Sequence, residues 1–148
     1  MRERPVLDQL NIVVKDMEAM TAFYQRLGVE LPTIPEEWAG WAPHHQNAEP
    51  QAGLHLDFDS SAFASQWNRG WPDGRTGVVL VFRVSSREAV DELCDELTAT
   101  GYGCEQPPYD AFWGARFAVV SDPDGNSVGL MSPLEPSMRA DPPALPER

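Results

Sequence analysis

The sequence is poor in cysteine, histidine and basic residues, and each shortage argues against a class of protein. Its 148 residues include two cysteines and three histidines, too few for a disulfide-stapled scaffold or a cysteine-rich zinc site. Cys94 falls in a helical pattern and Cys104 on an expected strand, so we expect both to be reduced structural thiols. Eleven basic against 23 acidic residues give a net charge of −12, which argues against nucleic acid and anionic membranes as partners.

Long hydrophobic runs are also missing. No apolar run approaches the roughly 20 residues of a membrane-spanning helix, and no apolar segment follows the basic start of the chain. We therefore expect a cytoplasmic protein. No Ser-His-Asp or Cys-His spacing indicates nucleophilic catalysis, and no glycine-rich phosphate loop follows a strand. The acidity either keeps the protein in solution or places carboxylates in a cleft that attracts a cation.

The clearest structural signal lies between Phe112 and Pro133. Two apolar runs, 117–120 and 128–131, flank Asp122-Pro123-Asp124-Gly125-Asn126, a pattern that predicts a β-hairpin with a tight turn. Because side chains alternate along a strand, Val128 and Leu130 should point to one face and Gly129 to the other. Turn chemistry explains the two aspartates.

A repeated pattern divides the chain into halves. A strand at 10–14 and an amphipathic helix ending at Gly28 recur as a strand at 78–84 and a helix ending at Gly101. Ser85 and Glu88 form a capping-box pattern at the second helix. We expect one domain over 1–133, with modules at about 5–59 and 77–133 and a linker at 60–76 that contains a short helix. The Pro-rich segment 134–148 is predicted to be a flexible tail.

The hairpin and the repeat together resemble the vicinal-oxygen-chelate superfamily of glyoxalases, bleomycin-resistance proteins and dioxygenases. The resemblance rests on Trp113-Gly114-Ala115-Arg116, on the turn 122–126 and on a last strand that ends in Ser132-Pro133. It implies an α+β fold of two βαβββ modules, whose sheet curves around a trough with the helices on the outer face. In the first module, residues 29–31 are predicted to open a strand, and the resemblance implies two more strands, around Trp38 to Ala42 and close to Gly53. In the last of these, His55, Asp57 and Asp59 should share one face.

The metal ligands of this superfamily come from four strands, as His or Gln, Glu, His and Glu. Carried over to this sequence, the first falls on Gln9 and its repeat partner on Val79, which cannot bind a metal. The second falls on His55 or Asp57, and the last on Gly129. His44 or His45 could supply a missing donor, although adjacent histidines in a Pro-rich loop are expected to face solvent. We therefore expect no metal cofactor, with Gln9, His55 and Asp57 as residual candidates.

Aromatic residues cluster where the resemblance puts the trough. Trp and Tyr suit flat or cationic organic ligands. Gly129 would let a ligand approach the backbone. Arg116 would either contact an anionic group of the ligand or face solvent. The candidate ligand-binding residues are Trp38, Trp41, His55, Asp57, Trp67, Trp71, Tyr109, Phe112, Trp113, Arg116 and Gly129.

These features favour metal-independent binding of a small aromatic or cationic molecule, which resembles sequestration by bleomycin-resistance proteins. The resemblance also implies a homodimer. Whether the protein is an enzyme stays open; the alternative is a glyoxalase-like lyase, an isomerase or a dioxygenase with a divalent metal ion. A third possibility, a dimerisation or regulatory module, predicts a trough plugged by the protein's own tryptophans.

Overall fold

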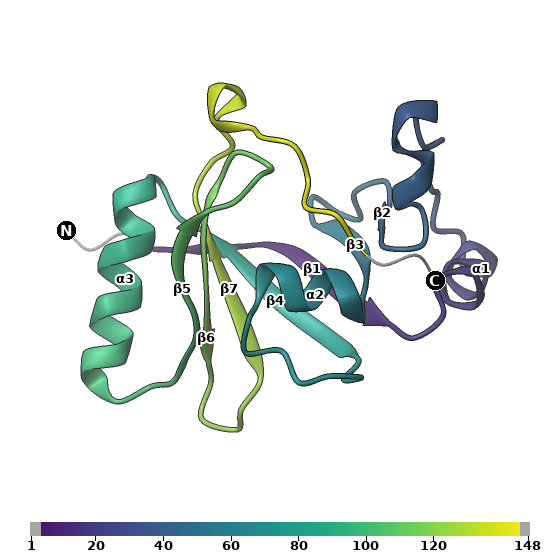
Figure 1. The fold of residues 1–148 in the computed structure, drawn as a ribbon. Helices are drawn as coiled ribbons and strands as arrows, with labels where there is room; N and C mark the ends of the chain where they lie inside the picture. Colours follow the sequence, from purple (N-terminus) through teal and green to yellow (C-terminus); the bar gives the residue numbers. More distant parts are fainter. Residues whose placement is uncertain (1–3, 146–148) are drawn as a thin grey trace.

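One mixed sheet organises the molecule, which is described here for residues 4–145 of a computed structural model (Figure 1). Within these residues seven strands are ordered β2-β3-β1-β4-β7-β6-β5. The first half holds β1 (Val6–Val14), α1 (Met17–Arg26), the 3₁₀ helix η1 (Glu36–Trp41), β2 (His45–Asn47) and β3 (His55–Ser60). The connection holds α2 (Ser61–Trp67). The second half holds β4 (Gly77–Arg83), α3 (Arg87–Thr100), β5 (Cys104–Asp110), β6 (Arg116–Ser121), β7 (Ser127–Met131) and the 3₁₀ helix η2 (Pro136–Met138).

The two halves meet at the antiparallel pair of β1 and β4 in the middle of the sheet. The second half has the expected βαβββ order, and its β6–β7 hairpin is antiparallel, with Val119 opposite Gly129. The α+β class and the hairpin are therefore confirmed. The described part of the first half has one strand fewer than a complete module.

The strands expected at 29–31 and around Trp38 to Ala42 are wrong. Residues 28–35 form no regular element, and Trp38 lies in η1. Pro32 and Pro35 lack the N–H groups that a strand donates to its neighbour. A single backbone hydrogen bond, from Glu49 N to Glu30 O at 2.8 Å, joins this segment to the chain after β2.

Local signals set the helix ends. The side chain of Asp16 accepts a hydrogen bond from Ala19 N at 3.0 Å and caps α1, while Gly101 ends α3 at φ 111°, a conformation that favours glycine. The N-cap of α3 is Ser86, which accepts from Ala89 N at 3.1 Å, so the expected capping role of Ser85 is wrong by one residue.

Helices cover both faces of the sheet. On the outer face, α1 packs near Leu56 and Phe58, and α3 packs against β5, β6 and β7; Figure 1 shows these helices at opposite ends. On the inner face, Trp67 and Trp71 of α2 and the following turn are buried against Phe117. The two module helices therefore lie on the outer face as expected, while α2, the short helix of the connection between the halves, fills part of the trough.

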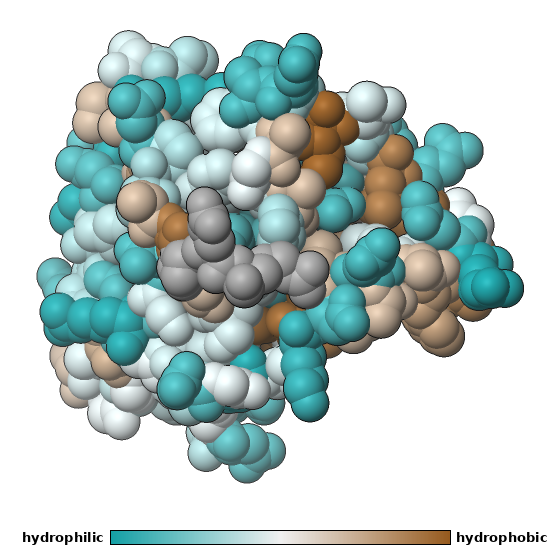
Figure 2. Space-filling model, turned by 45° about the vertical axis from the view of Figure 1, so that its right-hand side comes forward, coloured by the Kyte–Doolittle hydropathy of each residue, from teal (hydrophilic) through white to brown (hydrophobic). Residues whose placement is uncertain are grey.

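The segment after β7 runs back across the same inner face. Glu135 N donates to Gly114 O and Ala140 N donates to Phe112 O, both at 2.9 Å, and Leu145 packs against the core beneath. These contacts place residues 134–145 beside the open part of the trough, while the flexibility of this tail stays a prediction. The face in Figure 2 is mostly hydrophilic with separate hydrophobic patches. No helix within residues 4–145 is long and apolar enough to cross a membrane.

Candidate small-molecule site

A cavity of about 1290 Å³ occupies the part of the inner face that α2 leaves open. Its floor comes from β1, β2, β3 and β4, and its walls come from the segments around η1, Phe112 and the chain after β7. Tryptophan side chains therefore fill the trough over the second half of the sheet, and the trough over the first half stays open. A module sealed by its own side chains does not match this open half.

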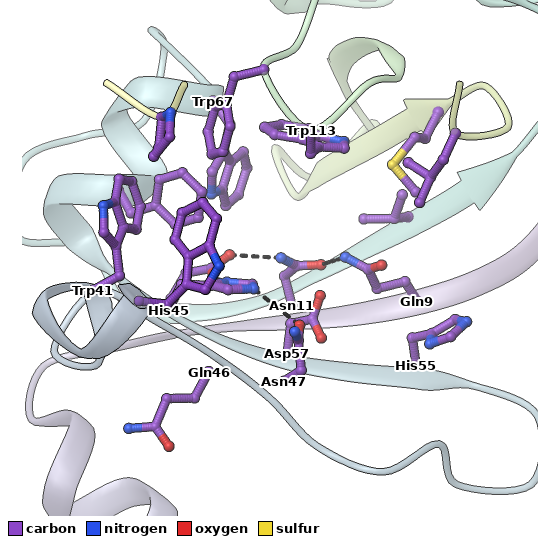
Figure 3. Close-up of a pocket in the computed structure, with 18 of the residues that line it drawn as sticks. Gln9, Asn11, Trp41, His45, Gln46, Asn47, His55, Asp57, Trp67 and Trp113 are labelled. Carbon is purple, nitrogen blue, oxygen red and sulfur yellow. Dashed lines mark hydrogen bonds and ion pairs between the residues drawn. The ribbon is translucent and has the colours of Figure 1, made fainter. Parts of the chain in front are cut away.

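Aromatic rings form one wall of the cavity (Figure 3). The Trp41 ring lies 5.1 Å from Phe63 and 6.0 Å from Phe112, centroid to centroid. Trp113 continues the wall at 5.3 Å from Phe112. Such edge and tilted contacts hold rings in fixed orientations, so the wall presents a preformed apolar surface.

Polar side chains form a continuous hydrogen-bonded chain on the floor, opposite these rings (Figure 3). Gln9 Nε2 donates to Asn11 Oδ1, and Asn11 Nδ2 donates to Asp59 Oδ2 at 2.6 Å. Asp59, which has no exposed surface, accepts a second bond at 2.5 Å from His45 Nδ1. The remaining nitrogen, His45 Nε2, lies 2.9 Å from Asn47 Oδ1. The buried carboxylate is thus held by two side chains from different strands.

His45 carries a positive charge within this row of hydrogen-bonded side chains. Burial alone would lower its pKa, but the attraction and hydrogen bond of Asp59 outweigh burial and raise the pKa to about 9. The geometry agrees, because a carboxylate and an amide oxygen both accept, so both ring nitrogens donate. The expectation that His44 and His45 face solvent is wrong: His44 is buried and bonds Ser60 Oγ at 2.7 Å.

Asp57 is a second carboxyl on the floor of the cavity, in a different environment. It lines the cavity, and among residues 4–145 no hydrogen bond reaches its carboxyl group. Burial raises its pKa to about 7; attraction to His45 works against this rise, and repulsion by Asp59 adds to it. Asp57 therefore changes charge near neutral pH, whereas the charge of His45 persists to higher pH.

Three of the positions at which the resemblance implies metal ligands, Gln9, His55 and Gly129, lie in one row across the sheet. His55 on β3 lies beside Gln9 on β1, Gln9 opposite Val81 on β4, and Val81 beside Gly129 on β7. The cross-strand neighbour of Gln9 in this row is Val81, whereas Val79, its counterpart in the sequence repeat, lies opposite Asn11. Valine and glycine offer no donor, so the row does not fit a four-ligand site. Nowhere in residues 4–145 do three or more His, Cys, Asp or Glu side chains gather as a metal site.

Gly129 does not open a path for a ligand. A Cβ atom at this position would lie 3.0 Å from Phe117 Cε1 and 3.1 Å from Val81 Cγ2. The protein's own side chains occupy the space above the glycine, which corrects the expectation of a close approach by a ligand.

The structure distributes the other candidates between the cavity and the rest of the molecule. Residues that line the cavity are Gln9, Trp38, Trp41, His55, Asp57, Trp67, Phe112 and Trp113. Tyr109 lines a separate, smaller cavity. Trp71 is buried and carries the Arg75 guanidinium over its ring at 4.7 Å.

Arg116 lies away from the cavity. Its Nε atom donates to Asp91 Oδ1 of α3 at 3.0 Å, and its Nη1 atom donates to Asp110 at 3.2 Å. The expectation that Arg116 contacts an anionic group of a ligand in the trough is therefore wrong, since these two carboxylates hold the guanidinium beside α3.

The sequence matches a known family along most of its length. The profile of the Glyoxalase/Bleomycin resistance protein/Dioxygenase superfamily covers residues 6–130. The chain belongs to this superfamily. No curated protein shows a significant sequence match.

Solved structures share the fold of this chain. The Mn(II)-bound glyoxalase from Novosphingobium aromaticivorans is 19% identical, with a TM-score of 0.60, over 88% of this chain and 40% of that chain. Methylmalonyl-CoA epimerase from Mycobacterium tuberculosis is 19% identical, with a TM-score of 0.56, over 88% and 89%. NAD-dependent benzaldehyde dehydrogenase from Legionella pneumophila is 24% identical, with a TM-score of 0.59, over 86% and 98%. These likenesses show the fold alone.

Sequence reasoning missed the polar chain in this superfamily member. The alternation of apolar and polar residues along β1 and β3 places Asn11 and Asp59 on the inner face, and this alternation was the signal from which both residues could have been found. His45 follows a Pro-containing loop without periodicity, so its place in β2 could not be found from the pattern.

Proposed function

We propose that the chain binds a small organic molecule with an aromatic ring, without a metal cofactor, and sequesters it as a bleomycin-resistance protein does. One observation carries the proposal: a cavity of about 1290 Å³ combines a wall of tryptophan and phenylalanine with a polar floor. Rings can stack on the wall, and a cationic group can approach the Asp57 carboxylate or the faces of the rings. We also propose that the protein is cytoplasmic, because of its composition, and that it forms a homodimer, because of its family resemblance.

A metal-dependent glyoxalase-like lyase, isomerase or dioxygenase is the second candidate. The adjacent side chains of Gln9 and His55, which both line the cavity, favour it. The valine and the glycine in the same row count against it, because neither supplies a ligand atom.

The experiment combines metal analysis with ligand binding. Protein purified without chelator is analysed for bound metals and then titrated with N-methylquinolinium, an aromatic cation, and with neutral 2-methylnaphthalene, while tryptophan fluorescence is followed. We expect no stoichiometric metal and saturable quenching by at least one probe. A bound divalent ion at one equivalent that raises the melting temperature would overturn the metal-free proposal, and no quenching by either probe would overturn ligand binding.

A further inference from the structure

The floor of the main cavity holds one carboxyl group that faces the open space. Asp57 lies on β3 between Asn11 of β1 and Asn47 of β2, and all three residues line the cavity. Its neighbours along β3, Leu56 and Phe58, belong to the core cluster that packs against α1 on the other face. Because side chains alternate along a strand, the Asp57 carboxyl points to the cavity side, where Figure 3 shows it beside Asn11.

The oxygen atoms of this carboxyl can be reached from the cavity. Asp57 is half-buried, and no hydrogen bond from residues 4–145 reaches its carboxyl group. Trp67 Nε1 is the one side-chain nitrogen or oxygen atom in this range that is both buried and without a hydrogen-bond partner. The Asp57 oxygens lack a partner without being buried in this way, so they keep surface for a group that enters the cavity. A ligand that donates hydrogen bonds to them would offset the cost of their partial desolvation.

The cation nearest to Asp57 is already engaged elsewhere. Both ring nitrogens of His45 donate hydrogen bonds, one to Asp59 and the other to Asn47. Asp59 also forms the ion pair with His45 at 2.5 Å, whereas His45 acts on Asp57 only by attraction through space. Asp57 therefore has no cation of its own among the described residues.

The charges on the cavity lining favour a cation over an anion. Among the described residues, five carboxyl groups face three basic side chains, which gives the lining a net charge of −2 when all are charged. The carboxyl groups are those of Asp8, Glu49, Asp57, Asp59 and Asp141, and the basic side chains are those of His45, Arg83 and Arg139. Arg83 is occupied by Asp8, whose Oδ1 atom accepts from its Nε atom at 3.4 Å.

The aromatic wall lies opposite the polar floor (Figure 3). One ligand can therefore place a ring against Trp41, Phe112 or Trp113 and a positive group at Asp57. A cation with N–H groups gives a carboxylate charge-assisted hydrogen bonds. A quaternary ammonium has no N–H group and can use only its charge and its attraction to the rings.

We infer that the ligand of the main cavity is an aromatic compound with a primary or secondary ammonium group, whose N–H groups donate hydrogen bonds to the Asp57 carboxylate. The inference rests on the proposed function and deepens it, because it names the class of ligand. The wall selects the ring, and Asp57 selects a cation that can donate.

Three probes with the same naphthalene ring test the inference. N-methyl-(2-naphthylmethyl)ammonium has a charge and N–H donors, trimethyl(2-naphthylmethyl)ammonium has a charge alone, and 2-(methoxymethyl)naphthalene has neither. Titration calorimetry at pH 8 compares them, because burial raises the pKa of Asp57 to about 7 and the carboxyl is charged at this pH. We expect the secondary ammonium to bind about 10-fold or more tightly than either of the other two probes, since hydrogen bonds to a charged group have this effect.

The comparison on the unmodified protein can overturn the inference by itself. Equal affinity of the secondary and quaternary ammonium probes would show that charge and ring contacts suffice. Equal affinity of the secondary ammonium and the ether would show that the ring alone is recognised.

Two variants assign the preference to one carboxyl group. Asp57→Asn should abolish the preference for the secondary ammonium over the ether and leave the affinity for the ether unchanged. Asp8→Asn is the matched control, because Asp8 lines the same cavity but already has Arg83 as its partner; this variant should keep the preference. A preference that persists in Asp57→Asn would overturn the role of Asp57.

Failure of the inference is distinguishable from failure of the proposed function. Saturable binding of all three probes with equal affinity overturns the ammonium site and leaves the cavity as a site for aromatic molecules. Absence of binding by these probes, by N-methylquinolinium and by 2-methylnaphthalene overturns both.

Discussion

His45 Nδ1 and Asp59 Oδ1 lie 2.5 Å apart, although the two residues belong to different strands. Asp59 is fully buried, and the His45 side chain is 31% exposed. This pair links the short edge strand β2 to the interior and places a positive charge at the edge of the cavity.

Removal of the Asp59 charge should destabilise the fold. In Asp59→Asn, His45 loses its carboxylate and Asn11 faces an amide in place of a charged acceptor. Breaking a fully buried pair costs about 3 to 5 kcal/mol; because His45 is partly exposed, we expect a loss of about 1 to 3 kcal/mol in urea unfolding at pH 7. The exposed Asp95→Asn on α3 is the matched control and should stay within about 0.5 kcal/mol of the unmodified protein.

The unfolding free energy should fall as the pH rises from about 6.5 to 9. The pKa of His45 is raised from 6.5 to about 9 in the folded state, so the folded protein holds a proton that the unfolded chain releases in this window. The stabilisation is complete below pH 6.5 and is lost as the pH passes 9. Urea unfolding across this range measures the slope, and His45→Gln should reduce it; an equal slope in the variant would contradict the assignment.

Asp57 should produce a second decline at lower pH. Its pKa is raised from 3.8 to about 7, so the folded state again binds more protons than the unfolded state, and stability falls between these values. We expect Asp57→Asn to flatten the decline between about pH 4 and 7 and to be more stable than the unmodified protein at pH 8. Lower stability of the variant at pH 8 would show that the carboxylate has a favourable partner.

Truncation at the rim of the cavity should weaken ligand binding without unfolding the protein. Trp38 lines the cavity and is 44% exposed, so Trp38→Ala should keep the melting temperature nearly unchanged. We expect it to weaken N-methylquinolinium binding by about 1 to 3 kcal/mol, since a lost stacking partner has this magnitude. Phe23, which is 55% exposed on α1 and lies outside the cavity lining, gives the control Phe23→Ala, whose affinity should be unchanged.

The two cysteines should differ in reactivity. Cys94 is buried on α3, and burial, together with the neighbouring Cys104, raises its pKa to about 11. Cys104 is exposed, with its Sγ atom 3.9 Å from Cys94 Sγ. Because the thiolate is the reactive form, iodoacetamide at pH 8 should add one group to the folded protein. Intact mass reads the number, and peptide mapping should find the label on Cys104; a label on Cys94 would contradict the burial argument.

The sequence predicted the second half well because its signals are local. The helix stop at Gly101, the apolar period of α3 and the turn at 122–126 each follow from a few adjacent residues. Asp122 Oδ1 accepts from Asn126 N at 2.8 Å, as turn chemistry predicts. The exposed carboxyl has a lowered pKa because it accepts hydrogen bonds from the Asn126 side chain and backbone.

The first half was harder to predict because its elements depend on distant partners. β2 has three residues and is defined by pairing with β3, which no local period could reveal. The sequence did not show where the short helix of the connection packs, for a similar reason: α2 and the turn after it cover the inner face through contacts of Trp67 and Trp71 with residues about 50 positions away, such as Phe117. Of the candidate site, the aromatic wall was predictable from composition, whereas the ion pair was not.

The packing above Gly129 limits which side chains this position can accommodate. A glutamate at this position would add a carboxylate, but its Cβ atom would lie only 3.0 Å from Phe117 Cε1 and 3.1 Å from Val81 Cγ2. Val81 also lies beside Gly129 in the sheet, so a longer side chain at 129 would need Phe117 and Val81 to move or to be made smaller at the same time. A single substitution at 129 would therefore disturb the packing between β4 and β6 before it added a functional group to the cavity.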